Sequence, residues 1–166
     1  NMGSIQINKS NIKGAVINSI PHQTSGAIAR KAGLADATGW CPVNQKTFES
    51  TLKNNIHVIG DSSNSKPLPK SGYAASSEGK MCAAAVVTAI NGVDMPDPSY
   101  SNTCYSLVGP EYGISVAAVY RLEAGKINKV KGAGGVSPKD ADESFRRAEA
   151  LYASGWYSSI TRDMFS

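Results

Sequence analysis

The most informative pattern of apolar and polar positions lies between Ile56 and Ile90. A short β-branched run, Ile56–Ile59, ends abruptly in Gly60-Asp61 and predicts a buried strand. A polar loop with two prolines follows, and then a long run of small and apolar residues predicts a helix that begins at Ser71 or Gly72. Asn91-Gly92 is a typical stop for that helix at about Ile90.

The residues before this segment predict shorter elements with more loop. Two strands are expected to form a hairpin, and a helix and a further strand follow. In order, these elements are Ser4–Ile7 and Gly14–Ile20 with a turn near Ser10-Asn11, the helix Thr24–Leu34, and the strand Lys46–Ser50.

The pattern changes after the proline-containing segment Val93–Pro98, which is the best candidate for a linker. Three consecutive strands are expected to form an antiparallel meander with a core on one side. A glycine-rich loop and a terminal helix follow, so the chain is α+β. The strands are Tyr100–Val108, Gly113–Glu123 and Lys126–Val130, with a turn at Ala124-Gly125; the loop is Lys131–Ser137, and the helix runs from about Asp140 into the 150s.

Composition and charge exclude several classes of function. The net charge is +4, but no basic stripe is interleaved with aromatic residues, so we expect no nucleic-acid partner. The longest weakly polar run, Met81–Ile90, is too short to span a bilayer. The spacing of the three cysteines and two histidines matches no metal motif, so no metal site is predicted. Because three is an odd number, at least one cysteine is free or paired outside this sequence.

The predicted strand and helix around Gly60-Asp61 suggest a ligand site. A carboxylate at the carboxyl edge of an α/β sheet lies where such sheets bind ligands. The helix start at Lys70-Ser71-Gly72 would direct backbone N–H groups into the same crevice. These two features together suit a ribityl-type cofactor such as a flavin. On residues alone, simpler interpretations stay open: Asp61 as a turn residue, Lys70 as a solvated charge, Cys104 as an inert buried thiol, and Trp156 as a core aromatic.

Five segments, taken together, resemble one known family. In this order they closely resemble the C-terminal portion of the flavoprotein subunit of flavocytochrome c sulfide dehydrogenase, over about Gly14 to Phe165. The segments are VINSIPHQTSGAIARKAGL, GWCPVNQKTFEST, IHVIGDSS…PLPKSGYAASSEGK, SYSNTCYSLVGPEYGISVAAVYR and SGWYSSITRDMF.

The resemblance implies a glutathione-reductase-like architecture with FAD as the cofactor. Residues 1–92 would be the last piece of the FAD-binding α/β domain, and residues 93–166 the small interface domain with the meander and terminal helix. The glycine fingerprint that should hold the FAD pyrophosphate lies outside this sequence. We therefore expect less than half of the enzyme here, and no FAD bound to the isolated chain.

The resemblance also implies the site residues. Asp61 would bind the ribityl chain, and Lys70, Ser71 and Gly72 would run beside the isoalloxazine. Cys104 would be the second member of a redox disulfide, and Trp156 would line the flavin pocket. Cys82 receives no catalytic role.

The implied reaction is the oxidation of sulfide in the periplasm. Hydrosulfide attacks the disulfide, electrons pass through the flavin, and a c-type haem on a separate cytochrome subunit receives them one at a time.

Two alternatives remain at this point. A sulfide:quinone oxidoreductase shares the scaffold, but the charges of the terminal helix argue against membrane docking, namely Arg146, Arg147, Glu149, Arg162 and Asp163. In isolation, the chain could instead be a non-catalytic assembly module. We also expect the apolar surface left by the absent domain to favour self-association.

Overall fold

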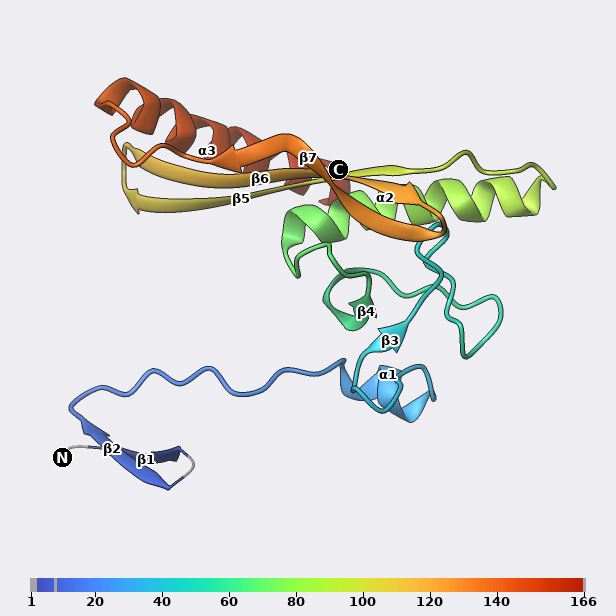
Figure 1. Cartoon of the computed structure of the whole chain (residues 1–166), viewed down its shortest axis with the longest axis horizontal. Coiled ribbons are helices and arrows are strands. Elements are labelled where there is room, and N and C mark those ends of the chain that lie inside the picture. Colours follow the sequence, from blue (N-terminus) through green and yellow to red (C-terminus); the bar gives the residue numbers. More distant parts are fainter. Residues whose placement is uncertain (1–2, 8, 166) are drawn as a thin grey trace.

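The computed structural model describes residues 3–7 and 9–165 and shows an α+β fold (Figure 1). An antiparallel sheet in the order β5-β6-β7 forms its centre, from β5 (Ser99–Gly109), β6 (Tyr112–Glu123) and β7 (Lys126–Val136). The terminal helix α3 (Glu143–Phe165) packs across one face, mainly against β6, and α2 (Gly72–Ile90) packs along β5. The predicted meander and terminal helix are confirmed.

Local signals account for the bounds of α2 and for the β6–β7 turn. The Ser71 side chain caps α2 by accepting a hydrogen bond from the Ala74 N–H. Asn91 ends the helix, and Gly92 follows at a φ of +63°. Ala124 and Gly125 both have positive φ, which the tight two-residue turn requires.

The sheet and terminal helix are longer than the sequence predicts. The segment Lys131–Val136 was expected to be a loop, but it continues β7, with a register irregularity opposite Ala118–Tyr120. Pairing resumes at Ala118↔Gly134, where the Gly134 backbone lies so close to the Ala117 carbonyl that a Cβ would clash with it. The glycines in this segment therefore permit close pairing of β7 with β6.

Four predicted elements before α2 are wrong in part or in whole. The hairpin consists of β1 (Gly3–Ile7) and β2 (Ser10–Gly14), so no strand covers Gly14–Ile20. The helix α1 spans only Ala27–Lys31. Lys46–Ser50 and Ile56–Ile59 make single bridges in place of strands.

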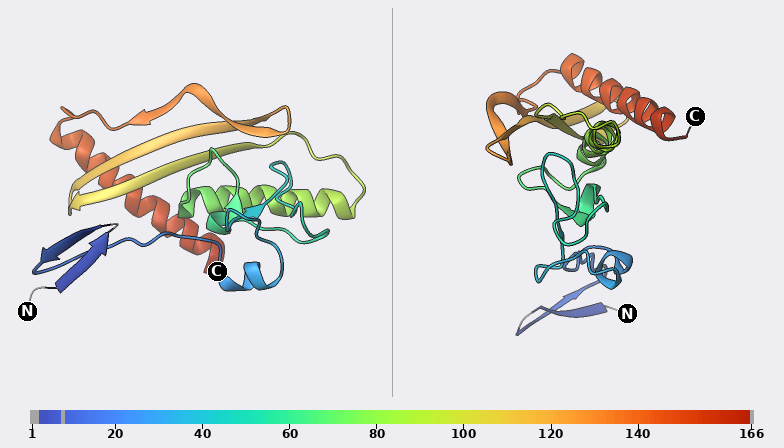
Figure 2. Two further views of the ribbon diagram at one scale, coloured as in Figure 1. Left: turned by 60° about the horizontal axis from the view of Figure 1, so that its bottom comes forward. Right: turned by 90° about the vertical axis from the view of Figure 1, so that its right-hand side faces the viewer.

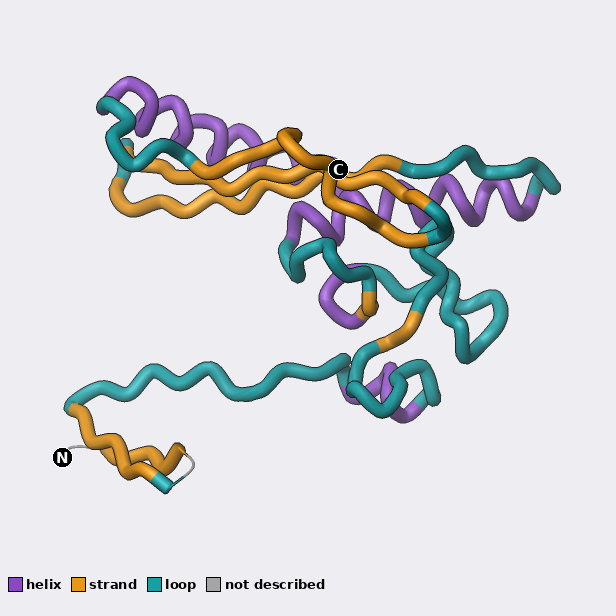
Figure 3. The backbone as a smooth tube through the Cα atoms, in the orientation of Figure 1, coloured by secondary structure: helices purple, strands orange, loops and turns teal. Residues whose placement is uncertain are grey.

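The remaining ladder in this region pairs β3 (Cys41–Pro42) with β4 (Ser63–Asn64), next to the 3-10 turn η1 (Gly60–Ser62). Figure 3 shows how much of the chain between β2 and α2 is loop.

The hydrophobic core lies between the β6–β7 turn end of the sheet and the loops of residues 41–68. Phe48 and Tyr100 are almost fully buried and meet edge to face at a centroid distance of 5.8 Å. Tyr100 donates to the Gln45 carbonyl at 2.7 Å, and the Ile127 N–H donates to Gln45 Oε1 at 2.7 Å. Residues on both sides of the expected domain boundary at 92/93 thus share one core; that boundary stays a prediction.

The N-terminal hairpin lies apart from this core. Figures 1 and 2 show β1 and β2 at the end of an extended segment that leads away from α1. Val16 and Ile20 on this segment are 89% and 86% exposed. An isolated two-stranded hairpin is marginally stable in water, so the body of the fold begins near α1.

The close packing of α3 on β6 yields a prediction. A Cβ at Gly113 would stand 2.5 Å from the Ala150 backbone nitrogen, a contact that α3 can relieve only by moving. We expect Gly113→Ala to lower the free energy of unfolding by about 2 kcal/mol. The matched control is Gly135→Ala on β7, where nothing lies within 4 Å and little change is expected. Urea denaturation measures both, and equal stabilities for the two variants would contradict the packing described.

Candidate functional site

The candidate site is built around the N-terminus of α2. Ser71 is the N-cap residue of α2, and the Ser71 hydroxyl accepts a hydrogen bond from the Ala74 N–H at 3.1 Å. The backbone N–H groups of Gly72 and Tyr73 belong to the same first turn, where helices have no internal acceptor to offer. They remain directed outward at the positive end of the helix dipole, so this end can bind the electronegative edge of a ligand.

The loop before α2 is attached to the helix by a buried carboxylate. Glu78 is 1% exposed and accepts hydrogen bonds from the Gly60 N–H at 2.5 Å and the Ser65 hydroxyl at 2.7 Å. The Ser63 hydroxyl lies 3.5 Å from the same carboxylate. Burial raises the pKa of Glu78, and these hydrogen bonds partly offset the rise. Sequence analysis did not select Glu78, because a glutamate within a helix carries no local sign of burial.

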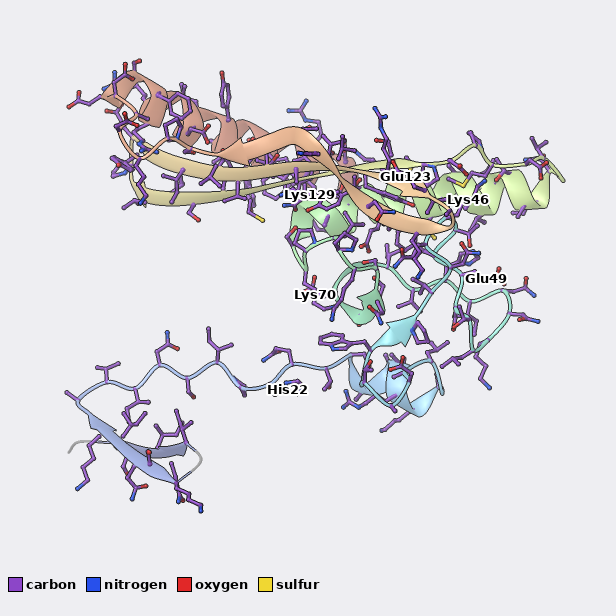
Figure 4. The ribbon with its side chains drawn as sticks, viewed as in Figure 1. His22, Lys46, Glu49, Lys70, Glu123 and Lys129 are labelled. Carbon is purple, nitrogen blue, oxygen red and sulfur yellow. The ribbon has the colours of Figure 1, made fainter. Side chains whose placement is uncertain are left out.

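Asp61 and Lys70 are both exposed on this loop, and Figure 4 labels Lys70. The Lys70 ammonium group donates to the Asp61 carbonyl, and to the Ser63 carbonyl at 3.0 Å. It also lies 3.7 Å from the centroid of the Trp40 ring, a cation–π contact. Partial desolvation lowers the pKa of Lys70, and the negative charge of Asp61 counteracts this. Asp61 is exposed, which leaves its carboxylate accessible to ligand hydroxyls.

The edge strand β5 brings Cys104 to the start of α2. Asn102 is 4% exposed, and its Oδ1 lies 2.5 Å from the Ser71 hydroxyl. Its Nδ2 lies 3.3 Å from Cys104 Sγ. Cys104 is a free, exposed cysteine, whereas Cys41 is buried and Cys82 is partly buried. The default interpretation of Cys104 as a buried inert thiol is therefore wrong.

Trp156 also reaches the start of α2, from α3. Its ring stacks on Tyr73 at a centroid distance of 5.6 Å and lies 6.2 Å from Tyr105. A Cβ at Gly72 would be 3.9 Å from its ring. Because neighbouring residues of a strand point to opposite faces, Tyr105 and Trp156 lie on the α3 side of β5 and Cys104 lies on the other.

The sheet face beside Cys104 is apolar and partly bare. Cys104 pairs with Val116, and Val116 pairs with Val136 on β7. Val116 and Val136 are 49% and 70% exposed, and Ile114 on the same face is 37% exposed. The thiol therefore stands at the border between the buried core and an uncovered apolar surface.

The six predicted site residues are connected through contacts around α2. Asp61 and Lys70 meet in the loop, Ser71 reaches Cys104 through Asn102, and Trp156 stacks on Tyr73, the residue next to Gly72. Asn102 and Tyr73 were missed in the sequence. The signal for Asn102 was its position two residues from Cys104, which places both on one face of a strand.

Within residues 3–7 and 9–165, no cluster of three or more histidine, cysteine or acidic side chains is placed to hold a metal ion. Of the helices described, none is long and apolar enough to cross a membrane.

A comparison with known families identifies the C-terminal part of the chain. Residues 96–165 match the family described as flavocytochrome c sulphide dehydrogenase, flavin-binding. The matched segment contains β5, β6, β7 and α3, and with them Cys104 and Trp156. Asp61 and Lys70–Gly72 precede it and contact it through the start of α2.

The buried carboxylate of Glu78 predicts a pH dependence of stability. Its pKa in the folded chain is raised above the ordinary value of 4.5, so the folded state holds this proton more tightly than the unfolded state. The stabilisation that protonated Glu78 gives the folded chain is fully present below pH 4.5 and is lost as the pH rises through the pKa of Glu78 in the folded chain. We expect Glu78→Gln to remove this pH-dependent loss, and Glu123→Gln, at an exposed position, to retain it. Thermal unfolding across pH measures the effect; the same slope in both variants would contradict it.

Proposed function

Because residues 96–165 belong to the flavin-binding family of flavocytochrome c sulphide dehydrogenase, we propose that the chain is the C-terminal part of an FAD-dependent sulfide dehydrogenase. The observation that carries the proposal beyond family membership is the connection of an exposed thiol, Cys104, to the N-terminus of α2 through Asn102 and Ser71. An exposed redox thiol is thereby linked to the helix end that would bind the cofactor.

The residues around α2 fit an FAD. The exposed Asp61 carboxylate can accept hydrogen bonds from ribityl hydroxyls, and the N–H groups of Gly72 and Tyr73 can donate to the oxygen and nitrogen of the pyrimidine edge. Lys70 adds positive charge at the same end. Trp156 stacks on Tyr73 from the α3 side, so it would border the cofactor on the face of the sheet opposite Cys104.

In the proposed reaction, Cys104 forms a disulfide with a cysteine that this sequence does not contain. Cys41 is buried in the core and Cys82 is partly buried within α2, so neither offers its thiol as Cys104 does. Hydrosulfide attacks the partner sulfur; the disulfide bond breaks, a new S–S bond forms on the partner, and Cys104 leaves as a thiolate. A bound FAD would supply the acceptor for the electron pair of the Cys104 thiolate, and a c-type haem on a partner would be the one-electron acceptor. A working disulfide and a c-type cytochrome partner favour a periplasmic location.

A sulfide:quinone oxidoreductase remains the second candidate, because only part of the charge on α3 lies at the surface: Arg162 and Asp163 are exposed, but two of the other charges are buried. Arg146 is 4% exposed and Glu149 is 9% exposed, so these two charges do not lie on the surface as the sequence argument assumed. Arg147 pairs with Glu111 at 3.1 Å. Large apolar side chains are exposed on the same helix, namely Leu151, Tyr152, Tyr157, Met164 and Phe165. These residues could contact a membrane surface.

The role of Cys104 can be tested in the native flavoprotein that contains this chain. We expect Cys104→Ser to keep its flavin and to lose sulfide-dependent reduction of cytochrome c by about a thousandfold, because a serine oxygen cannot form the disulfide. Cys82→Ser is the matched control and should retain activity. Sulfide oxidation that reduces a soluble quinone but not cytochrome c would favour the second candidate. Undiminished activity of Cys104→Ser would refute both the sulfide dehydrogenase and the sulfide:quinone oxidoreductase proposals.

The isolated chain provides a complementary prediction. The α2 N-terminus and Asp61 supply few contacts to offset the cost of ordering a ligand as large as FAD. We expect the purified chain to lack flavin and to behave as an assembly module without catalysis. Absorbance spectroscopy after incubation with FAD and gel filtration measures this, and a stoichiometric yellow complex would contradict it.

A further inference from the structure

The Ser71 hydroxyl holds two hydrogen bonds whose directions are fixed. Its oxygen accepts the Ala74 N–H at 3.1 Å, which makes it the helix cap. It also lies 2.5 Å from Asn102 Oδ1, an atom that carries no proton. The proton in that contact is therefore the hydroxyl proton, and Ser71 donates to Asn102.

This donation fixes the orientation of the Asn102 amide. With Oδ1 turned toward Ser71, the Nδ2 group is the nearer atom to Cys104 Sγ, at 3.3 Å against 3.9 Å for Oδ1. The opposite orientation would place an N–H group against the Ser71 hydroxyl. The Ser71 oxygen would then accept two hydrogen bonds, and its own hydroxyl proton would have no acceptor. Because Asn102 is 4% exposed, water does not offer its side chain an alternative partner.

The three hydrogen bonds point in one direction, from the positive end of α2 to the sulfur. The Ala74 N–H polarises the Ser71 hydroxyl, which polarises the amide, whose N–H points at Cys104. Such chains strengthen each member. A thiolate accepts an N–H much more strongly than a neutral thiol does. We propose that Asn102, oriented by Ser71, is a positioning residue that stabilises Cys104 as a thiolate.

The other groups facing Cys104 do not replace this donor. Its strand partner Val116 and the adjacent Val136 carry no charge. Tyr120 of β6 is buried, and both burial and Cys104 raise its pKa, so it stays neutral at neutral pH. At the start of α2, the Lys70 ammonium group is engaged by the Asp61 and Ser63 carbonyls. The Glu78 carboxylate is held by the Gly60–Ser65 loop.

The catalytic use of the thiolate rests on the proposed function. The hydrogen-bond chain that stabilises it is formed only by residues of this chain and does not depend on that function. In the proposed reaction Cys104 is the leaving sulfur, and a disulfide breaks faster when its leaving thiolate is stabilised. A donor aimed at the sulfur before sulfide arrives would therefore favour cleavage on the side that releases Cys104.

The test is the rate at which iodoacetamide alkylates Cys104 in the purified chain, followed by peptide mapping at several pH values. We expect Asn102→Asp to slow the reaction at pH 7 about tenfold, because a carboxylate repels the thiolate and donates nothing. Asn128→Asp makes the same change at an exposed position on β7 and should leave the rate unchanged. Cys82 serves as the internal reference for folding.

A second pair of variants covers the case in which Asn102→Asp does not fold. Ser71→Gly keeps most of the capping preference but loses the hydroxyl that orients the amide, so we expect alkylation of Cys104 to slow about threefold. Ser71→Thr keeps the hydroxyl and should match the original rate.

Unchanged Cys104 alkylation in a folded Asn102→Asp or Ser71→Gly chain would overturn the proposal. Because alkylation requires no flavin, sulfide or cytochrome, this result stands apart from the outcome for sulfide activity of the native protein.

Discussion

The buried carboxylate of Glu78 is the interaction on which the site depends. Residues 43–62 form no regular strand, so few backbone ladders hold them against the rest of the fold. Glu78 compensates by accepting hydrogen bonds from Gly60 and Ser65 in the loop that carries Asp61. Burying a carboxylate is costly unless several hydrogen-bond donors satisfy it. Because the loop supplies these donors, it is favoured in the one position where they reach Glu78. Without this attachment, Asp61 and Lys70 would not be held beside the start of α2.

The start of α2 then connects two parts of the chain that the family comparison separates. Residues 96–165 match the flavin-binding family, yet the groups that complete the site precede them. Ser71 forms a hydrogen bond with Asn102 of β5, and Phe48 packs against Tyr100 two residues earlier on the same strand. The matched segment therefore relies on earlier residues both for part of its core and for the hydrogen bonds around Cys104.

The sequence predicted those elements whose signals are local. The cap at Ser71, the stop at Asn91-Gly92 and the turn at Ala124-Gly125 each involve adjacent residues, and α2 and the meander follow. Ile56–Ile59 was a poor prediction because β-branched residues form a strand only where another strand pairs with them, and Ile56 and Ile59 are each 42% exposed here. Among the site residues, the Ser65 contact of Glu78 and the Ser71 contact of Asn102 escaped notice because these partners lie 13 and 31 residues away in the sequence. Such contacts depend on how elements pack, which periodicity does not reveal.

The alternation of side chains along β5 explains how one strand can serve two sides of the site. Cys104 faces the bare apolar surface at Val116, while its neighbour Tyr105 lies near Trp156 on the α3 side. The start of α2 stands at the edge of this strand and reaches both sides, through Ser71 to Asn102 and through Tyr73 to Trp156. A shift of one residue in the β5–β6 register would exchange the two faces and turn the thiol toward α3. The close approach of Gly113 to the Ala150 backbone fixes which face of β6 meets α3. The observed β5–β6 register, with Cys104 opposite Val116, then places the thiol on the other face. The packing of α3 on β6 thus helps to determine which side of the sheet presents the reactive sulfur.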